Sequence, residues 1–245
     1  MRPDQRENRS IEKPTAPPMI ELSDVLFRYR EGEFELRIPR LEIAQGEQAG
    51  LIGPSGSGKT TLLHLVAGIQ RPERGRIAVD GTAMSALSEA NRRVFRICRL
   101  GLVFQEFALL EHLSVLDNVL LPYRITPALR LDASARDRAR SLIQRVGLAD
   151  DADRLVPHLS QGERQRVAVC RALVTEPSLL LADEPTGNLD PANKFRVIDI
   201  LRDYAKEQHA ALLTVTHDHD LLDRFPRVID FKSIHSERTR GVASP

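Results

Sequence analysis

The stretch Gly53-Pro54-Ser55-Gly56-Ser57-Gly58-Lys59-Thr60 decides how the rest of this 245-residue chain is interpreted. Residues 48–52 before it have the apolar pattern of a strand, and residues 61–67 after it have the pattern of a helix. Glycines at such a junction let consecutive backbone N–H groups face one anion, and the helix N-terminus adds partial positive charge. The stretch therefore predicts a phosphate-binding loop rather than a glycine-rich turn without a ligand.

Two side chains at the end of this loop have expected roles toward a bound nucleotide. Lys59 is expected to reach β- and γ-phosphate oxygens, because an ammonium at this position of the pattern points into the phosphate cradle. The hydroxyl of Thr60 is expected to bind Mg²⁺. The loop alone therefore predicts both a nucleotide and a metal ion.

A second segment supplies the acids that a metal-bound nucleotide needs. Residues 179–182 are an apolar run, typical of a strand buried on both faces, and Asp183 and Glu184 follow it directly. Open α/β sheets bind ligands at the carboxyl ends of their strands. Asp183 is therefore expected to hold Mg²⁺, through water, and Glu184 to orient or deprotonate the attacking water. A strand that ends in an ordinary surface turn is the alternative, and the pairing with the glycine loop counts against it.

Two further positions have both a structural and a functional interpretation. His217 follows the expected strand 212–216, where it could contact the γ-phosphate or the water, although a lone histidine at a strand end is more often structural. Ser160 and Glu163 have the spacing of a capping box at a helix start. With Gly162 beside it, the same helix start could also bind an anion.

Composition and charge limit the possible partners. The formal net charge of +1 argues against a basic nucleic-acid surface, so no nucleic-acid partner is expected. No apolar run reaches the roughly 18–20 residues of a membrane span, and the charged N-terminus leads to no signal-peptide core. Cys98 and Cys170 are far apart and fit reduced thiols. The chain is therefore expected in the cytoplasm, meeting a membrane only through a partner.

The order of the predicted elements indicates an α/β fold. Short strands are expected at 20–25, 34–38, 41–43 and 76–79, another at 100–104, and helical periodicity at 114–146. Helices at 163–174 and 192–207 then alternate with strands at 179–181 and 212–216, which predicts a parallel sheet with helices on both faces. Residues 1–18 are expected to form a disordered tail, and 233–245 a second tail.

The motifs together resemble the ATP-binding subunits of ABC transporters. Residues 159–166 are similar to the signature sequence of that family, residues 53–61 to its Walker A loop, and 187–190 to its D-loop. The resemblance assigns Tyr29 to adenine stacking, Gln105 to the Q-loop, and His217 to the switch histidine. The nucleotide contacts that it implies are Tyr29, Gly53, Pro54, Ser55, Gly56, Ser57, Gly58, Lys59, Thr60, Thr61, Ser160, Gly162 and Asp190. The catalytic residues that it implies are Glu184, His217 and Gln105, and the metal ligands are Thr60, Gln105 and Asp183.

The resemblance also implies a domain arrangement and a mechanism. The ABC ATP-binding domain would cover 19–232, as a P-loop NTPase with a parallel core sheet, an N-terminal antiparallel β subdomain and a helical signature subdomain at about 106–175. Two copies would sandwich ATP and Mg²⁺ head-to-tail, with Ser160 and Gly162 of one copy facing Lys59 and Glu184 of the other. The dimer would drive a separate integral membrane permease from the cytoplasmic face of the inner membrane. Gln105 would begin a helical segment at 106–123, beside which the permease would dock.

Within the family, residues 163–168 and 181–190 are most similar to the lipoprotein-releasing and macrolide-exporting ATPases. Gln161 departs from the family, which usually has glycine there. Glutamine is compatible with helical dihedral angles, whereas a positive φ at this position would weaken activation of the opposite site. A soluble ABC ATPase of translation or DNA repair, and a scaffold that binds ATP to regulate a membrane complex, are the alternatives to a transporter subunit.

Overall fold

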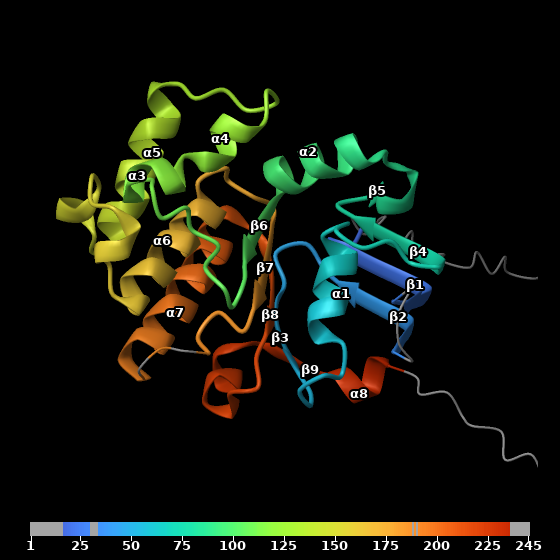
Figure 1. Cartoon of the computed structure of the whole chain (residues 1–245). Coiled ribbons are helices and arrows are strands. Elements are labelled where there is room, and N and C mark those ends of the chain that lie inside the picture. The colour runs from blue at the N-terminus through green and yellow to red at the C-terminus, as the bar shows by residue number, and fades with distance from the viewer. Residues whose placement is uncertain (1–16, 30–33, 188, 190, 236–245) are drawn as a thin grey trace, which may run out of the picture.

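The computed structural model describes residues 17–29, 34–187, 189 and 191–235, with the side chains of 191 and 192 excepted. Two β-sheets form its framework (Figure 1). The antiparallel sheet has the order β2 (Glu35–Ile43), β1 (Ile20–Arg28), β4 (Arg74–Val79), β5 (Thr82–Ala83). The second sheet has the order β6 (Leu100–Val103), β7 (Leu179–Asp183), β8 (Ala211–Val215), β3 (Gln48–Ile52), β9 (Arg227–Asp230), and all of its pairings are parallel.

The parallel sheet separates two hydrophobic cores, and β7 shows how. All five residues of β7 are buried, and successive side chains of a strand point to opposite faces. Leu179 and Leu181 join the core shared with the antiparallel sheet and α1 (Lys59–Val66), whereas Leu180 and Ala182 join the core on the helical side. The continuous apolar run of β7 is thus the pattern of a strand covered on both faces.

The remaining helices pack on the second face of the parallel sheet, on one another, or along the border of the sheet. They are α2 (Glu89–Arg99), α3 (Val115–Val119), α4 (Leu121–Ile125), α5 (Ala133–Arg145), α6 (Gln161–Leu173), α7 (Pro191–Gln208) and α8 (Phe231–Ile234), with 3-10 turns η1 (Met84–Ala86), η2 (Ala149–Asp151), η3 (Val156–His158) and η4 (His219–Arg224). In Figure 1, α1 lies between the two sheets, whereas α6 and α7 lie beyond the parallel sheet. No helix in the described part of the chain is long and apolar enough to cross a membrane.

This architecture confirms the predicted fold class, but several predicted elements differ. The expected strands 34–38 and 41–43 are one strand, β2, because Pro39 lies in an edge strand, where a missing N–H is tolerated. The predicted helical segment 106–123 is wrong at its start, because helix begins only at Val115. The helical stretch 114–146 is likewise divided into α3, α4 and α5. The helices α2 and α8 and the strand β9 were not predicted.

The predicted domain limits stay predictions. Most of the two expected tails falls on residues 1–16 and 236–245, outside the described residues. Helix α8 ends at Ile234, two residues past the predicted limit of 232. The predicted helical subdomain, about 106–175, contains α3, α4, α5 and α6.

Candidate nucleotide site

The glycine loop joins β3 to α1 with a backbone that needs glycine at two turns. Gly56 and Gly58 have φ of 74° and 109°, the left-handed region that other residues rarely adopt. A Cβ on Gly58 would also lie 2.8 Å from Cζ of Phe34. Gly58 is the N-cap of α1, so the loop ends where the free N–H groups of that helix begin. Sequence and geometry together produce an anion site.

A cavity of about 450 Å³ opens over this loop. Its lining includes Ser55, Gly56, Gly58, Lys59, Thr60 and Thr61 from the loop and α1, Gln105 after β6, and Asp183, Glu184, Val215 and His217 at the ends of β7 and β8. Parallel strands end at the same edge of a sheet, which is why segments far apart in sequence meet here. Gly53, Pro54 and Ser57 belong to the same loop.

Lys59 lines the cavity, and its ammonium is held against the backbone of the loop. Its side chain is buried, and Nζ donates hydrogen bonds to the carbonyl oxygens of Gly53 and Pro54, both at 2.8 Å. These bonds keep the ammonium beside the backbone N–H groups that would face a phosphate. Binding of a polyanion would exchange loop carbonyls for phosphate oxygens as partners of Lys59.

The acids at the end of β7 have different surroundings. Asp183 is buried, and its Oδ1 has no hydrogen-bond partner among the described residues. Glu184 has a φ of 46°, a strained conformation for a residue with a side chain, and its N–H donates to the carbonyl of Val215 at 3.0 Å. Its Oε1 lies 2.8 Å from Nδ1 of His217. The structure thus joins Glu184 and His217 as one polar pair.

Aromatic side chains form the opposite wall of the cavity. Tyr29 is 39% exposed, and its hydroxyl lies 3.1 Å from Oγ1 of Thr61. Its ring packs edge-on against Phe27 and, with centroids 5.7 Å apart, against Phe34. Phe34 lines the cavity but was missed by sequence reasoning, since no motif contains it. The wall leaves an aromatic surface next to the phosphate loop.

The signature residues lie elsewhere. Ser160 and Gly162 do not line the cavity. Ser160 caps α6, with its N–H donating to Glu163 Oε2 at 2.7 Å and its Oγ accepting from the N–H of Glu163 at 3.3 Å. Gln161 is the first residue of α6 and has no positive φ, so the position does not need glycine. Asp190 lies outside the described residues.

The acids do not form a metal site on their own. No group of three or more His, Cys, Asp or Glu side chains in the described part of the chain could hold a metal ion. The oxygen atoms of the cavity include the buried, unpartnered Oδ1 of Asp183 and the hydroxyl of Thr60, an exposed residue. Hard cations such as Mg²⁺ take ligands of this kind and usually complete their shell with phosphate oxygens and water.

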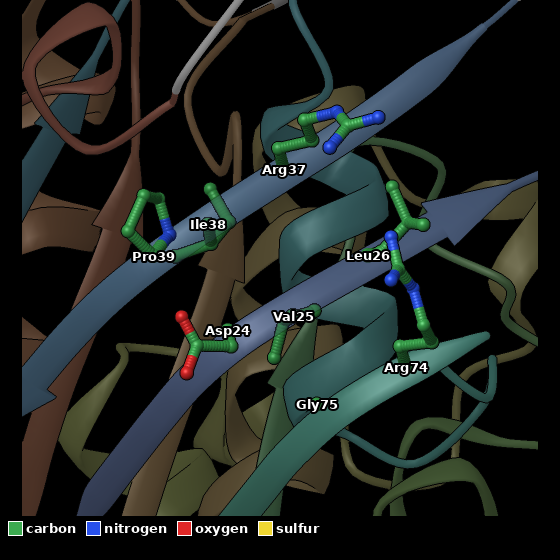
Figure 2. Close-up of a pocket in the computed structure, with 8 residues that line it drawn as sticks. All are labelled: Asp24, Val25, Leu26, Arg37, Ile38, Pro39, Arg74 and Gly75. Carbon is green, nitrogen blue, oxygen red and sulfur yellow. The ribbon is translucent and has the colours of Figure 1, made fainter.

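Two other hollows lack these features. One, of about 380 Å³, lies on the antiparallel sheet where β1 bulges at Asp24, between Arg37 and Arg74 (Figure 2). Gly75 faces it across the bulge, and no loop N–H groups or paired acids reach it. The other is an apolar groove of about 290 Å³. Its lining includes Arg96, Leu100, Leu102, Phe104, Leu121 and Ile125.

Comparisons with known proteins show the family of this chain. The family model described as ABC transporter matches residues 36–187. The lipoprotein-releasing system ATP-binding protein LolD of Paramagnetospirillum magneticum is 41% identical over 213 residues, covering 86% of this chain and 93% of LolD. The macrolide export ATP-binding/permease protein MacB of Syntrophobacter fumaroxidans is 37% identical over 214 residues, covering 86% of this chain and 30% of MacB.

A solved structure of an ATP-binding cassette has the same fold. It is described as a dimeric post-hydrolysis state bound to ADP and Pi, with a TM-score of 0.77 and 30% identity over 86% of this chain and 94% of that chain. The strand, glycine loop and helix, with acids at the ends of neighbouring strands, define a P-loop nucleotide-binding protein. The chain belongs to the ABC transporter family, and it is an ATP-binding and ATP-hydrolysing subunit.

Proposed function

We propose that ATP binds in the cavity over the glycine loop and is hydrolysed there to drive a membrane permease. The observation that carries this proposal is the meeting of the loop with Asp183 and with the Glu184–His217 pair in one cavity. The base of ATP would stack on Tyr29, and the phosphates would lie on the N–H groups of residues 53–61 with Lys59 beside them.

Mg²⁺ would be held by Thr60 and Asp183, with Gln105 at its edge. The unpartnered Oδ1 of Asp183 favours this assignment, since a buried carboxylate oxygen without a partner is costly unless a cation satisfies it. The ion would supply charge neutralisation at the β- and γ-phosphates. By holding the ion in place, Thr60, Asp183 and Gln105 would indirectly orient the phosphates.

Glu184 and His217 would act on the attacking water. The carboxylate of Glu184 is the base in reach of the cavity, and its contact with His217 fixes where the carboxylate points. His217 is 70% exposed in its side chain and would gain a partner in the γ-phosphate. Binding of the γ-phosphate to His217 would thereby affect where the carboxylate of Glu184 points.

The second part of the site would come from another copy of the chain. Ser160 and Gly162 lie at the exposed start of α6, away from the cavity of their own copy. In a head-to-tail homodimer they would contact the γ-phosphate held by the other copy, at the N-terminus of α6. Loss of the γ-phosphate would then remove the contacts that join the copies.

The apolar groove beside α2 and α4 would receive the permease. A cytoplasmic segment of the permease with apolar side chains would bury Leu102, Leu121 and Ile125. The subunit would then lie peripherally on the cytoplasmic face of the inner membrane. The resemblance to LolD and MacB favours a lipoprotein-release or export system. A regulatory ABC protein that binds ATP without driving transport is the alternative.

Purified chain with Glu184→Gln tests the proposal. The variant should bind ATP with normal affinity but lose at least about a hundredfold in turnover, because only the water-activating carboxylate is lost. It should also form an ATP-dependent dimer in light scattering. Lys59→Ala is the matched control: it should lose nucleotide affinity and form no dimer. Normal turnover by the Glu184→Gln variant would refute the assigned base, and turnover by wild type separates the motor from a regulatory ATP-binding protein.

A further inference from the structure

The side chain of Lys194, on helix α7, forms ion pairs with the loop that follows His217. Lys194, the fourth residue of α7, places Nζ 2.6 Å from Oδ2 of Asp218 and 3.3 Å from Oδ2 of Asp220. The lysine side chain is 15% exposed and the Asp218 side chain 27%, so solvent screens this contact less than an ordinary surface pair. Hydrogen bonding to Asp218 raises the pKa of Lys194, and hydrogen bonding to Lys194 lowers the pKa of Asp218.

The same aspartate fixes the backbone on both sides of the histidine loop. Its N–H donates to Oγ1 of Thr216 at 3.0 Å, which closes a turn around His217. Its Oδ1 accepts from the N–H of Asp220 at 3.0 Å, as the N-cap of η4. Lys194 therefore holds, through Asp218, the backbone from which the His217 side chain reaches Glu184.

Packing limits where Lys194 can point. Nζ lies 5.3 Å from the ring centroid of Phe195, and the guanidinium of Arg224, at the end of η4, lies 5.1 Å from the same ring. Arg224 in turn contacts Asp199, one helical turn further along α7. The loop and η4 are thus fastened to α7 at two points, with an aromatic ring between the two cations.

Charge gives a second reason for a cation at this position. Asp218 and Asp220 follow His217 directly, and Asp183 and Glu184 line the cavity that would receive the phosphates of ATP. Without Lys194, the carboxylates of Asp218 and Asp220 would add uncompensated negative charge to the segment that follows His217, and negative charge disfavours a polyanion nearby. The ammonium of Lys194 offsets one of these two negative charges.

We infer that Lys194 is a positioning residue for ATP hydrolysis: it holds the loop of His217 through Asp218 and so sets the geometry of the Glu184–His217 pair. This inference rests on the proposed roles of Glu184 and His217. It concerns the first turn of α7, which lies outside the phosphate loop, the acids of β7 and the signature segment. Lys194 would not touch the nucleotide, so its removal would change the rate of hydrolysis rather than binding.

Steady-state kinetics of the full chain with Mg²⁺ and ATP test the inference. Lys194→Met should lower kcat about tenfold, because small displacements of catalytic groups are costly, and should leave KM for ATP within about twofold. Lys194→Arg should recover most of the rate, since the cation is kept. Lys206→Met, an exposed lysine of the same helix, is the matched control and should behave as wild type.

A double-mutant cycle separates positioning from general destabilisation. Asp218→Asn should slow hydrolysis to a similar extent, and the combined variant should be no slower than either single variant, because the two residues act through one contact. Losses that multiply, or unchanged turnover by Lys194→Met, would overturn the inference. Hydrogen exchange gives a readout that needs no turnover: amides of residues 216–222 should exchange faster in Lys194→Met than in Lys206→Met, and equal exchange would also overturn it.

The variant His217→Ala distinguishes the proposed role of His217 from that of Lys194. A large loss of turnover in His217→Ala together with wild-type turnover in Lys194→Met would refute the role of Lys194 alone. Wild-type turnover in His217→Ala would refute the proposed role of the histidine, and with it the reason for positioning its loop.

Discussion

Gln161 departs from the family resemblance, and its environment explains why the departure is tolerated. Glycine is required where φ is positive or where a Cβ has no room. At Gln161 the backbone is that of the first residue of α6, and the side chain is exposed. Glutamine therefore keeps the helix start intact, and the two neighbours with proposed roles, Ser160 and Gly162, are unaffected.

Gln161→Gly should change little in activity and slightly lower stability. We expect ATP turnover within about twofold of wild type and a decrease in the free energy of unfolding of no more than about 0.5–1 kcal/mol, because glycine in a helix gains freedom in the unfolded chain. Turnover and urea denaturation measure the two effects. A large rise in turnover would instead indicate that Gln161 obstructs the opposite copy.

The residues of the site differ in how far sequence alone could predict them. The glycine loop holds its chemistry in consecutive residues, so the pattern around Lys59 predicts both its conformation and its ligand. Phe34, which directly precedes β2, contacts Tyr29 only through tertiary packing. The same holds for Lys194 of α7 and Asp218. Neither Phe34 nor Lys194 stands in a motif, so sequence reasoning missed both.

At the scale of elements, the start of α6 has two separable roles. Ser160 and Glu163 form reciprocal hydrogen bonds, and either truncation to alanine breaks the capping box. Each should lower the free energy of unfolding by about 1 kcal/mol. Only Ser160→Ala should also strongly reduce ATP turnover, because its hydroxyl is proposed to contact the γ-phosphate on the opposite copy. Denaturation and ATPase assays on both variants check this, and equal losses of activity would contradict a specific role for Ser160.

The capping box also predicts a pH dependence. Hydrogen bonding to Ser160 lowers the pKa of Glu163. A carboxyl whose pKa is lower in the folded state stabilises the fold above its unfolded pKa of about 4.3, and this contribution is lost as pH falls through the folded pKa. The stability difference between wild type and Glu163→Ala should therefore be present at pH 7 and shrink below about pH 4. A difference that is constant with pH would exclude the charged carboxylate as its source.

Element boundaries were hardest to predict where packing overrides local pattern. Helix α2 is rich in arginine and buries only Arg92 fully, but residues 90, 94, 97 and 98 have the apolar spacing of one helix face, so its pattern could have been recognised. Strand β9 has only four residues, and it is defined by its parallel pairing with β3, which the local sequence does not reveal. By contrast, β7 and β8 are mostly apolar and fully buried, and sequence reasoning located both.

At the scale of the whole molecule, the nucleotide cavity and the proposed permease contact are two different surfaces. The carboxyl ends of β7 and β8 form the nucleotide cavity, whereas α2, β6 and α4 border the apolar groove. Residues 104–114, which connect β6 to α3, contain Gln105 at the cavity and Phe104 and Ala108 at the groove. This segment is the shortest covalent connection between the cavity and the groove. A shift of Gln105 on binding or loss of the γ-phosphate would therefore displace groove residues as well.

Ile125→Glu tests the groove as the permease contact. Ile125 is 57% exposed, so a carboxylate there should not unfold the chain, but it would bury a charge against an apolar permease segment. We expect the variant to hydrolyse ATP in isolation as wild type does, and to be lost from the membrane fraction of cells that contain the permease. Val228→Glu, at another exposed apolar residue (44%) on β9, is the control and should remain with the membranes. Retention of Ile125→Glu on membranes would exclude this end of the groove as the docking site, whereas loss of both variants would indicate that charge anywhere on the surface weakens the association.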